Sequence, residues 1–430
     1  MCRALSHHTL PHHPVWIGTL LALAAPAVLA QSAGQVVKPP QAQAWIDIAT
    51  IGGLAMPGMG GPGPSGPSGL GVLGGLFGGG GAGGAKNSFG QTQSMSAGRW
   101  VDVTLYSRAN PALAEAQQAV PAGFLSPALA LRSPQETRGT PPEPGDEKPV
   151  EPSDAERPKG KLHLYWGCGD AARPGQPRVV DFATATPAEI ARAFQSRRAT
   201  QRGTHLASGR PVWPNAADAR MVPPQASLVG EHAFSGAQVP ADFRFQIPAA
   251  QDLMPAIALQ QQDDGGVVRL QWGALPTARA YFIAAMGSRG RDEMVVWTSS
   301  EQPDMGFGLI DYQTNPAVDR WLQEKVLLAP GTTQCSVPKG IFSGEGTMLR
   351  MIAYGSELNL AHPPRPSNPK QAWEPVWAVK LRVKSVTMAM LGQPGGAGEP
   401  APTGEPPARP AEPADKKPSP KDLLKGIFGR

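Results

Sequence analysis

The sequence predicts a mainly β protein, with two β-rich, sandwich-like domains, long disordered Gly/Pro-rich segments and few short helices. Short runs in which apolar and polar residues alternate recur along the chain, as in half-buried strands. Glycine and proline account for 51 and 48 of the 430 residues, an abundance typical of long non-globular stretches. Within the two predicted domains, only two segments carry clear helix-start signals.

The first thirty residues have the features of a secretory signal peptide. An apolar run from Ile17 to Ala30 follows Arg3 and ends in small residues of the kind that signal peptidase accepts. The run is short for a bilayer span; an uncleaved N-terminal membrane anchor is the alternative. We therefore expect a periplasmic or secreted protein with no transmembrane span after processing.

The rest of the chain is long enough for two domains. We assign residues 31–250 to the first, interrupted by a Gly-rich segment at about 52–94 and a Pro/acid-rich segment at about 134–160. Residues 48–85 contain 17 glycines and no charge, so they cannot bury enough apolar surface to offset the entropy of ordering. A flexible loop is the expectation there; a membrane-associating glycine zipper is the alternative.

Two look-alike segments flank the glycine tract and predict neighbouring strands of one sheet. Residues 45–50 (WIDIAT) and 100–105 (WVDVTL) share the same alternation and β-branched content. Further strands of this domain are expected at residues 161–166, 178–182 and 242–247. Between them, Thr186 and Glu189 form a capping box that opens a helix, with Pro187 in its first turn.

The region from 251 to 391 predicts a sandwich more clearly. The turn-like sequence 263–266 (DDGG) separates two strands, and Asn315-Pro316 begins one helix, with Val318, Trp321 and Leu322 on one face. Strands are expected at residues 257–260, 267–272, 280–286, 294–298, 333–337, 347–354 and 377–387. Seven short strands with turn signals between them are typical of antiparallel sandwiches.

The residues 268–272 (VRLQW) and 280–283 (AYFI) resemble the second and third strands of a fibronectin type III-like, immunoglobulin-like domain. Residues 349–354 (LRMIAY) resemble a later strand of the same fold. The resemblance covers about residues 253–391 and implies that Trp272 and Tyr281 both pack into the core. The whole chain also resembles uncharacterised exported proteins of Gram-negative-type envelopes, which implies an architecture but no activity.

After residue 391 the composition changes again. Residues 392–420 are rich in Pro, Glu, Ala and Lys and predict a disordered linker. Residues 421–430 predict a short amphipathic segment, with Leu423, Leu424, Ile427 and Phe428 on one helical face. A helix of that length is marginal alone in water, so we expect it to dock on a partner.

Two cysteines remain after removal of the leader, Cys168 and Cys335. An oxidising compartment permits a disulfide between them. Two separate buried thiols, acting as small hydrophobic side chains, are the alternative.

The mature chain contains no catalytic, cofactor or metal motif that we can identify. Its four histidines (His163, His205, His232 and His362) are far apart and lack a metal-ligand spacing. A net charge of +5 and a pI near 9.1 are mild for this length, and they predict no nucleic-acid footprint. We predict no cofactor and no bound metal.

Two features near residue 380 are candidates for surface contacts. Trp373 and Trp377 lie on a Pro-interrupted approach to the last strand, and we expect an exposed aromatic pair that could contact carbohydrate. Along that strand, Lys380, Arg382 and Lys384 alternate with apolar residues. The row of charges predicts protection of a sheet edge, with contact to anionic envelope polymers or lipid head groups as the alternative.

These features favour a non-catalytic exported envelope protein that acts as a binding or structural module. Its expected partner is an envelope protein or a cell-wall or glycan component. The alternative is a carbohydrate-active or hydrolytic envelope enzyme whose site forms only in the fold. A deep pocket with two close carboxylates would favour that alternative.

Overall fold

A computed structural model describes residues 35–53, 87–126, 128–134, 160–199, 203–290, 292–342 and 346–392. The predicted leader, most of both predicted insertions and the C-terminal tail lie outside these ranges. The strands are β1 (Ala42–Gly53), β2 (Gly98–Ser107), β3 (Glu115–Ala119), β4 (Ala128–Arg132), β5 (Lys161–Trp166), β6 (Arg178–Asp181), β7 (Val212–Trp213), β8 (Gly230–Gly236), β9 (Arg244–Ile247), β10 (Gln260–Asp264), β11 (Val267–Gln271), β12 (Ala280–Ser288), β13 (Glu293–Thr298), β14 (Gln334–Val337), β15 (Met348–Tyr354), β16 (Leu358–His362) and β17 (Trp377–Met390). The helices are α2 (Pro187–Ala193) and α3 (Asn315–Gln323), with short 3₁₀ turns η1 (Gln91–Gln93) and η2 (Ala249–Gln251).

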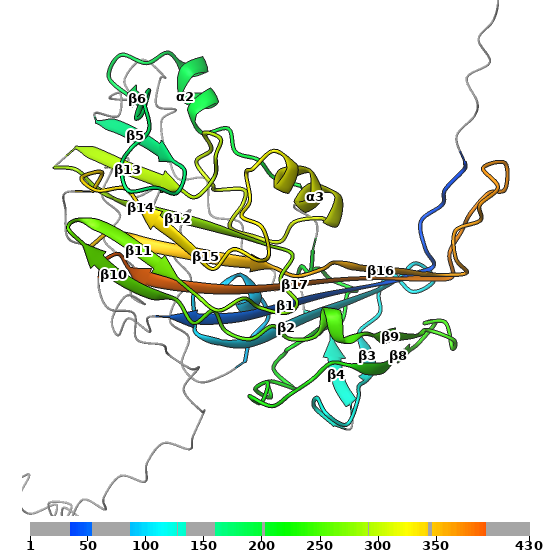
Figure 1. The fold of residues 1–430 in the computed structure, drawn as a ribbon. Helices are drawn as coiled ribbons and strands as arrows, with labels where there is room; N and C mark the ends of the chain where they lie inside the picture. The colour runs from blue at the N-terminus through cyan, green and yellow to red at the C-terminus, as the bar shows by residue number, and fades with distance from the viewer. Residues whose placement is uncertain are drawn as a thin grey trace, which may run out of the picture.

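The described residues are mainly β, as the sequence predicts. Fourteen strands form one sheet in the order β6-β5-β13-β12-β15-β17-β1-β2-β7-β4-β3-β8-β9, with β16 paired to β17 beside that path. The two look-alike segments are the neighbours β1 and β2, antiparallel, and this prediction is confirmed. β1 and β17 pair in parallel at the centre of the sheet, so the two ends of the described chain meet there (Figure 1).

A second, three-stranded sheet packs on one face of the large sheet. Its order is β10-β11-β14, and one hydrophobic core contains Leu270 and Val337 of this sheet together with Ile283 and Met351 of the large one. The predicted turn between β10 and β11 is confirmed, because Gly265 and Gly266 connect the two strands at φ +63° and +88°. Both values favour glycine over residues that carry a Cβ.

Loops and α3 cover the opposite face. Val318 and Trp321 of α3 pack with Phe282, Ile352 and Val386 of the large sheet in a separate hydrophobic cluster. The central strands are therefore covered on both faces, and in Figure 1 α3 lies over β15 and β12. This cover matters for the charged residues of β17, which point to the same face as Val386.

Local sequence signals located both helices. Thr186 and Glu189 form the predicted capping box at the start of α2, and α3 begins at Asn315 with Val318 and Trp321 buried. The strand expected at 257–260 is displaced, because β10 is Gln260–Asp264. The tight glycine turn brings the polar residues just before it into register with β11. Ile257 and Leu259, just before Gln260, are buried without forming a ladder.

The predicted boundary near residue 250 does not separate two sheets. Strand β5, from the first predicted region, pairs in parallel with β13 from the second. Strand β1, from the first region, pairs with β17 from the second over twelve residues. Two strand ladders therefore join the two halves of the described chain.

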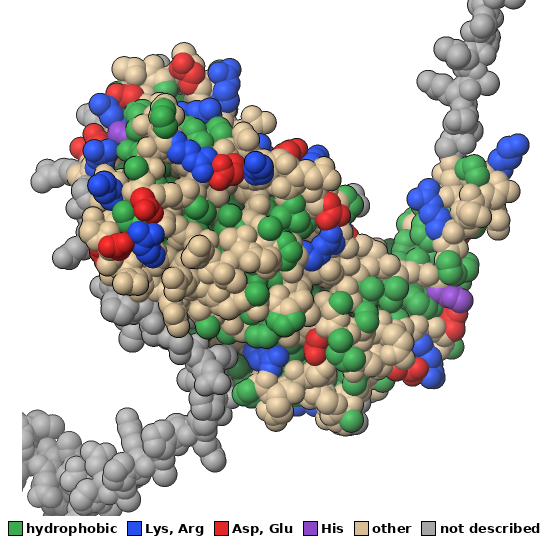
Figure 2. All heavy atoms as spheres, in the orientation of Figure 1, with side chains coloured by type: hydrophobic (Ala, Val, Ile, Leu, Met, Phe, Trp, Pro, Cys, Tyr) green, Lys and Arg blue, Asp and Glu red, His purple; other side chains and the backbone are tan. Residues whose placement is uncertain are grey.

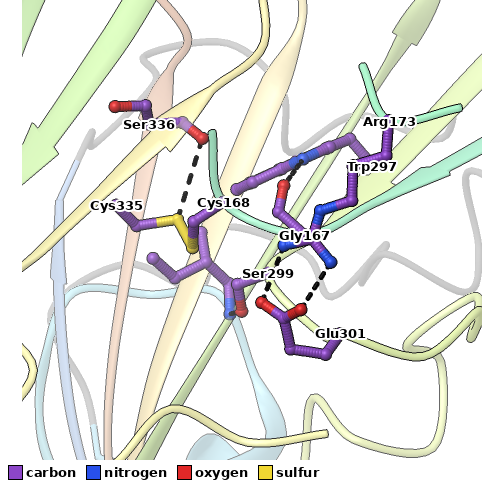
Figure 3. Close-up of a disulfide and its surroundings, with 9 residues drawn as sticks. Gly167, Cys168, Arg173, Trp297, Ser299, Glu301, Cys335 and Ser336 are labelled. Carbon is purple, nitrogen blue, oxygen red and sulfur yellow. Dashed lines mark hydrogen bonds and ion pairs between the residues drawn. A yellow bond between two sulfur atoms is a disulfide. The ribbon is translucent and has the colours of Figure 1, made fainter. Parts of the chain in front are cut away.

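Cys168 and Cys335 are joined by a disulfide with an S–S distance of 2.08 Å. Cys335 lies in β14, and Cys168 lies in the loop after β5, so the bond ties the small sheet to the large one (Figure 3). The amide of Gly169 donates to the carbonyl of Ser336 at 3.0 Å, which aligns the loop with β14. Beside it, Arg173 forms an ion pair with Glu301.

Replacing both cysteines by serine should lower the free energy of unfolding. The disulfide closes a separation of 167 residues, and for a loop of that size the chain-entropy model gives at most about 5 kcal/mol. Urea unfolding of the Cys168→Ser/Cys335→Ser variant against the oxidised wild type measures the loss. Equal unfolding midpoints, with the wild-type bond verified by non-reducing peptide mapping, would contradict this role.

Candidate functional site

Two cations of the row on β17, Arg382 and Lys384, are buried, and the prediction that the row protects a sheet edge is wrong. The third, Lys380, is partly exposed and pairs with Glu357 at 3.3 Å. β17 is a central strand, flanked by β1 on one side and by β15 and β16 on the other. The Arg382 side chain is 5% exposed and that of Lys384 is 1% exposed. Alternation of polar and apolar residues looks the same in sequence whether the polar face is solvated or covered by ion pairs.

Asp47 of β1 lies directly across from Arg382 in the parallel register. The guanidinium donates from Nε to Oδ1 at 2.7 Å and from Nη2 to Oδ2 at 2.6 Å, a bidentate pair. Oδ2 also accepts from the amide and the hydroxyl of Thr204, at 3.0 and 2.8 Å. Asp47 therefore joins the sheet to the loop that covers this face.

Tyr312 lies over the cations of β17. Its ring centroid is 4.3 Å from the Arg382 guanidinium carbon and 4.2 Å from the Lys384 ammonium nitrogen, both within cation–π range. Its hydroxyl donates to the carbonyl of Ile48 at 2.9 Å. Next to it, the carboxylate of Asp311 accepts from Lys384 at 2.9 Å. Burial raises the pKa of Asp311, but the Lys384 ammonium, the Tyr312 amide and the Arg382 guanidinium together outweigh burial and hold that pKa at about 2.

Asp102 of β2 faces Asp47 across the β1–β2 ladder. Its carboxylate accepts from the amides of Gly90 and Thr92, at 2.9 and 3.3 Å, and from the hydroxyl of Thr92. The residue is 1% exposed, and burial raises its pKa to about 7 despite these hydrogen bonds, with Asp47 adding to the rise. Near neutral pH, Asp102 is therefore only partly ionised.

This arrangement is a structural network that substrates cannot reach. Asp47 and Asp102 are a pair of close carboxylates, but each is 1% exposed. Thr204, Tyr312 and Thr92 cover them from three different loops. General acid–base chemistry requires a reacting group within hydrogen-bond reach of the acid, and here protein atoms occupy those positions.

The most exposed candidate surface is a projecting arm formed by residues 35–40 and 363–376. The two segments pair in parallel, with the amide of Trp373 donating to the carbonyl of Val36 and that of Lys38 to the carbonyl of Trp373, both at 2.9 Å. Figure 1 shows them extending together beyond the end of β16. At the base of the arm, Glu374 pairs with Lys38 and Arg108.

The two tryptophans predicted as an exposed pair occupy different environments. Trp377 is 7% exposed, and it stacks between Phe243, at a centroid distance of 5.1 Å, and His362, at 5.5 Å, so exposure is a wrong prediction for this residue. Trp373 is partly exposed on the arm. Arg365 lies over the Trp373 ring at 5.8 Å. The two residues are close in sequence, but β17 begins at Trp377, so they belong to different parts of the fold.

A groove of about 590 Å³ lies over strand β6 and helix α2. Among its lining residues are Arg178 and Arg192 and the carboxylates of Asp181 and Glu189. Both carboxylates already accept backbone hydrogen bonds, Asp181 from Ala183 at 3.0 Å and Glu189 from Thr186 at 2.7 Å. The Thr186 hydrogen bonds lower the pKa of Glu189, which makes it a poor general acid near neutral pH.

The histidines of the described residues are dispersed in the fold. His163 contacts Glu293 at 3.1 Å, and His232 is buried against Phe245, where burial lowers its pKa. Within the described ranges no three metal-ligating side chains gather at one place. In the same ranges, no helix has the length and apolar character needed to cross a membrane. The predicted docking residues Leu423, Leu424, Ile427 and Phe428 lie outside the described residues.

The variant Asp102→Asn should remove a pH dependence of stability. Because the folded-state pKa of about 7 exceeds the ordinary 3.8, the stability that Asp102 contributes is fully present below the ordinary value. This stability is lost as the pH rises through the folded-state pKa, and the loss is on the order of 4 kcal/mol. Urea unfolding measures the free energy of unfolding of both proteins at about pH 5 and about pH 8. The value for the variant, relative to that for the wild type, should be higher at about pH 8. A difference between the two proteins that does not change with pH would contradict the burial of an ionisable Asp102.

The variant Arg382→Met should destabilise the fold by about 3–5 kcal/mol, because it leaves Asp47 buried without its partner. Arg320→Met is the matched control, since its ion pair with Glu324 is 3.8 Å long and the Arg320 side chain is 63% exposed. Chemical unfolding of both variants measures the contrast. Equal, small effects would show that the Asp47–Arg382 pair does not hold the sheet.

No protein-family model, curated protein or solved structure matches this chain. Three features of the described residues bear on function. These are a charge network enclosed by protein, a partly exposed Arg–Trp pair on the arm, and an open groove whose carboxylates are already hydrogen-bonded.

Proposed function

We propose that the chain is a non-catalytic protein of the cell envelope, exported by its N-terminal leader, that binds an envelope component through the arm. The observation that carries this proposal is the contrast between enclosed charges and exposed aromatic and aliphatic groups. The close carboxylates Asp47 and Asp102 are buried, whereas Val36 and Val37 of the arm are 62% and 50% exposed. Exposed apolar residues gathered at one place are typical of contact surfaces.

We further propose that residues 253–391 form a fibronectin type III-like sandwich that supports the arm. In immunoglobulin-like domains, the first, second and fifth strands share one sheet, and the third, sixth and seventh share the other. When β16, which pairs with β17 beside the main path, is left out of the count, the pairings β10-β11-β14 and β12-β15-β17 follow that division. The rings of Trp272 and Tyr281 meet in the core at a centroid distance of 5.6 Å, in agreement with the packing implied by the resemblance.

Within the described residues, the carbohydrate-active or hydrolytic alternative would use the groove over β6 and α2. Its carboxylates Asp181 and Glu189 are both used in local backbone hydrogen bonds. Turnover of cell-wall polymer by the wild type, abolished in Glu189→Gln, would replace the binding proposal with this one.

The variant Val36→Ser/Val37→Ser/Trp373→Ser should lose binding to isolated envelopes, because it removes the apolar contact groups of the arm. The control Val179→Ser/Leu206→Ser changes two other exposed apolar residues, which are 47% and 58% exposed. Co-sedimentation of each purified protein with envelope fragments measures binding. Retention of the arm variant at wild-type level would contradict the proposed function.

Deleting residues 419–430 in the same assay tests the C-terminal docking face. If envelope binding survives the deletion, the arm suffices. If the deletion abolishes binding while the arm variant retains it, Leu423, Leu424, Ile427 and Phe428 form the contact surface and the assignment to the arm is wrong.

A further inference from the structure

We propose that the arm binds the surface of a membrane that contains anionic lipids. This inference rests on the proposed function and names the partner of the arm. It follows from the residue types at the arm, from their charge and exposure, and from the place of the arm in the chain.

The arm combines apolar and basic groups on one narrow projection. Val36 and Val37 are among the exposed large hydrophobic residues, and Trp373 adjoins them through the bridge between Val37 and Trp373. Arg365 and Lys370 are exposed on the facing loop. Figure 2 shows Lys and Arg side chains toward the end of this projection and hydrophobic side chains along it. Tryptophan is enriched at membrane–water interfaces, where one part of the ring system is apolar and the indole N–H needs a polar partner.

The charge of the arm is one-sided. Residues 31–41 and 358–373 contain no Asp or Glu. The acidic Glu374 is already paired with Lys38 and with Arg108. Four cations, Lys38, Arg108, Arg365 and Lys370, stand against the single acid Glu374, so the arm and its ion pairs carry a net charge of +3. Such a surface complements phosphate groups, and the adjacent valines favour a lipid surface over a soluble phosphate polymer, because a polymer offers no apolar phase.

The arm also begins close to the part of the chain that enters the membrane during export. The apolar run ends at Ala30, and the arm starts at Gln35. Five residues of fully extended chain span at most about 17 Å. The arm is therefore tethered near the bilayer for as long as the leader remains attached, and a chain cleaved after Ala30 gains a positively charged amino group beside the arm.

Vesicle flotation tests the proposal with the chain that starts at Gln31. The vesicles contain either phosphatidylcholine alone or equal parts of phosphatidylcholine and phosphatidylglycerol. We expect binding only to the anionic vesicles. The variant Lys38→Gln/Arg365→Gln/Lys370→Gln should lose on the order of 100-fold in the partition coefficient, because each basic residue near an anionic surface contributes about fivefold.

The matched control is Lys339→Gln/Arg244→Gln/Arg320→Gln, which removes the same number of charges from exposed sites outside the arm and the groove. Its binding should stay at the wild-type level, and so should that of Trp373→Phe, which retains an aromatic ring. Thermal unfolding verifies that each variant is folded, and protease resistance of the arm verifies that its two segments remain paired.

Three results would overturn the proposal. They are wild-type binding equal on both kinds of vesicle, no binding to either, or an equal loss in the arm and control triples. If the arm variants lose binding to whole envelopes while the wild type ignores both vesicles, the partner is an envelope protein or glycan. In that case the membrane proposal falls and the proposed function stands. If the arm variants retain envelope binding, both fall.

Discussion

The ion pair between Asp47 and Arg382 fixes how the two ends of the described chain meet. The residues are 335 positions apart in sequence, yet they are direct partners in the parallel ladder of β1 and β17. A slip of one residue would turn Arg382 to the apolar face of the sheet and leave Asp47 without a cation. A buried ion pair adds little net stability compared with well-packed apolar residues. The Asp47–Arg382 pair instead specifies the register of β1 and β17, because a slip of one residue leaves a buried charge unpaired.

The same charges hold the cover of the sheet in place. Asp47 accepts hydrogen bonds from Thr204, and Lys384 binds Asp311. Tyr312 contacts both cations of β17. Two covering segments, one at Thr204 and one at Asp311 and Tyr312, thus depend on one polar stripe in the middle of an otherwise apolar sheet face. Because Asp47, Arg382 and Lys384 are shielded from water, these charges interact more strongly than they would at the surface.

Local signals in the sequence were sufficient for most individual elements. The look-alike strands, the Asp263–Gly266 turn and the Thr186 capping box each depend on residues within a few positions of one another, and all three appear in the fold. The pairing of β1 with β17 has no such local signal. The sequence did contain one hint that was missed. The acidic residues on the polar faces of β1 and β2 complement the cations on the polar face of β17.

The candidate surface was only partly predictable for a similar reason. Trp373 and Trp377 are four residues apart, but β17 begins at Trp377, which carries that ring into the space between Phe243 and His362. Val36 and Val37 gave no signal in sequence, because their exposure follows from pairing with a loop more than 330 residues away. Long-range pairing of this kind decides both which residues are buried and which remain available for contact.

The central claim is that β1 and β17 form one cooperative unit with the strands on both sides of residue 250. Hydrogen–deuterium exchange of the oxidised protein, read by mass spectrometry, tests it most directly. The amides of β1, β15 and β17 should be the slowest to exchange, and they should be released together with those of β5 and β13 in a single unfolding event. Two exchange events at clearly different denaturant concentrations, one for residues before 250 and one for residues after it, would contradict the account.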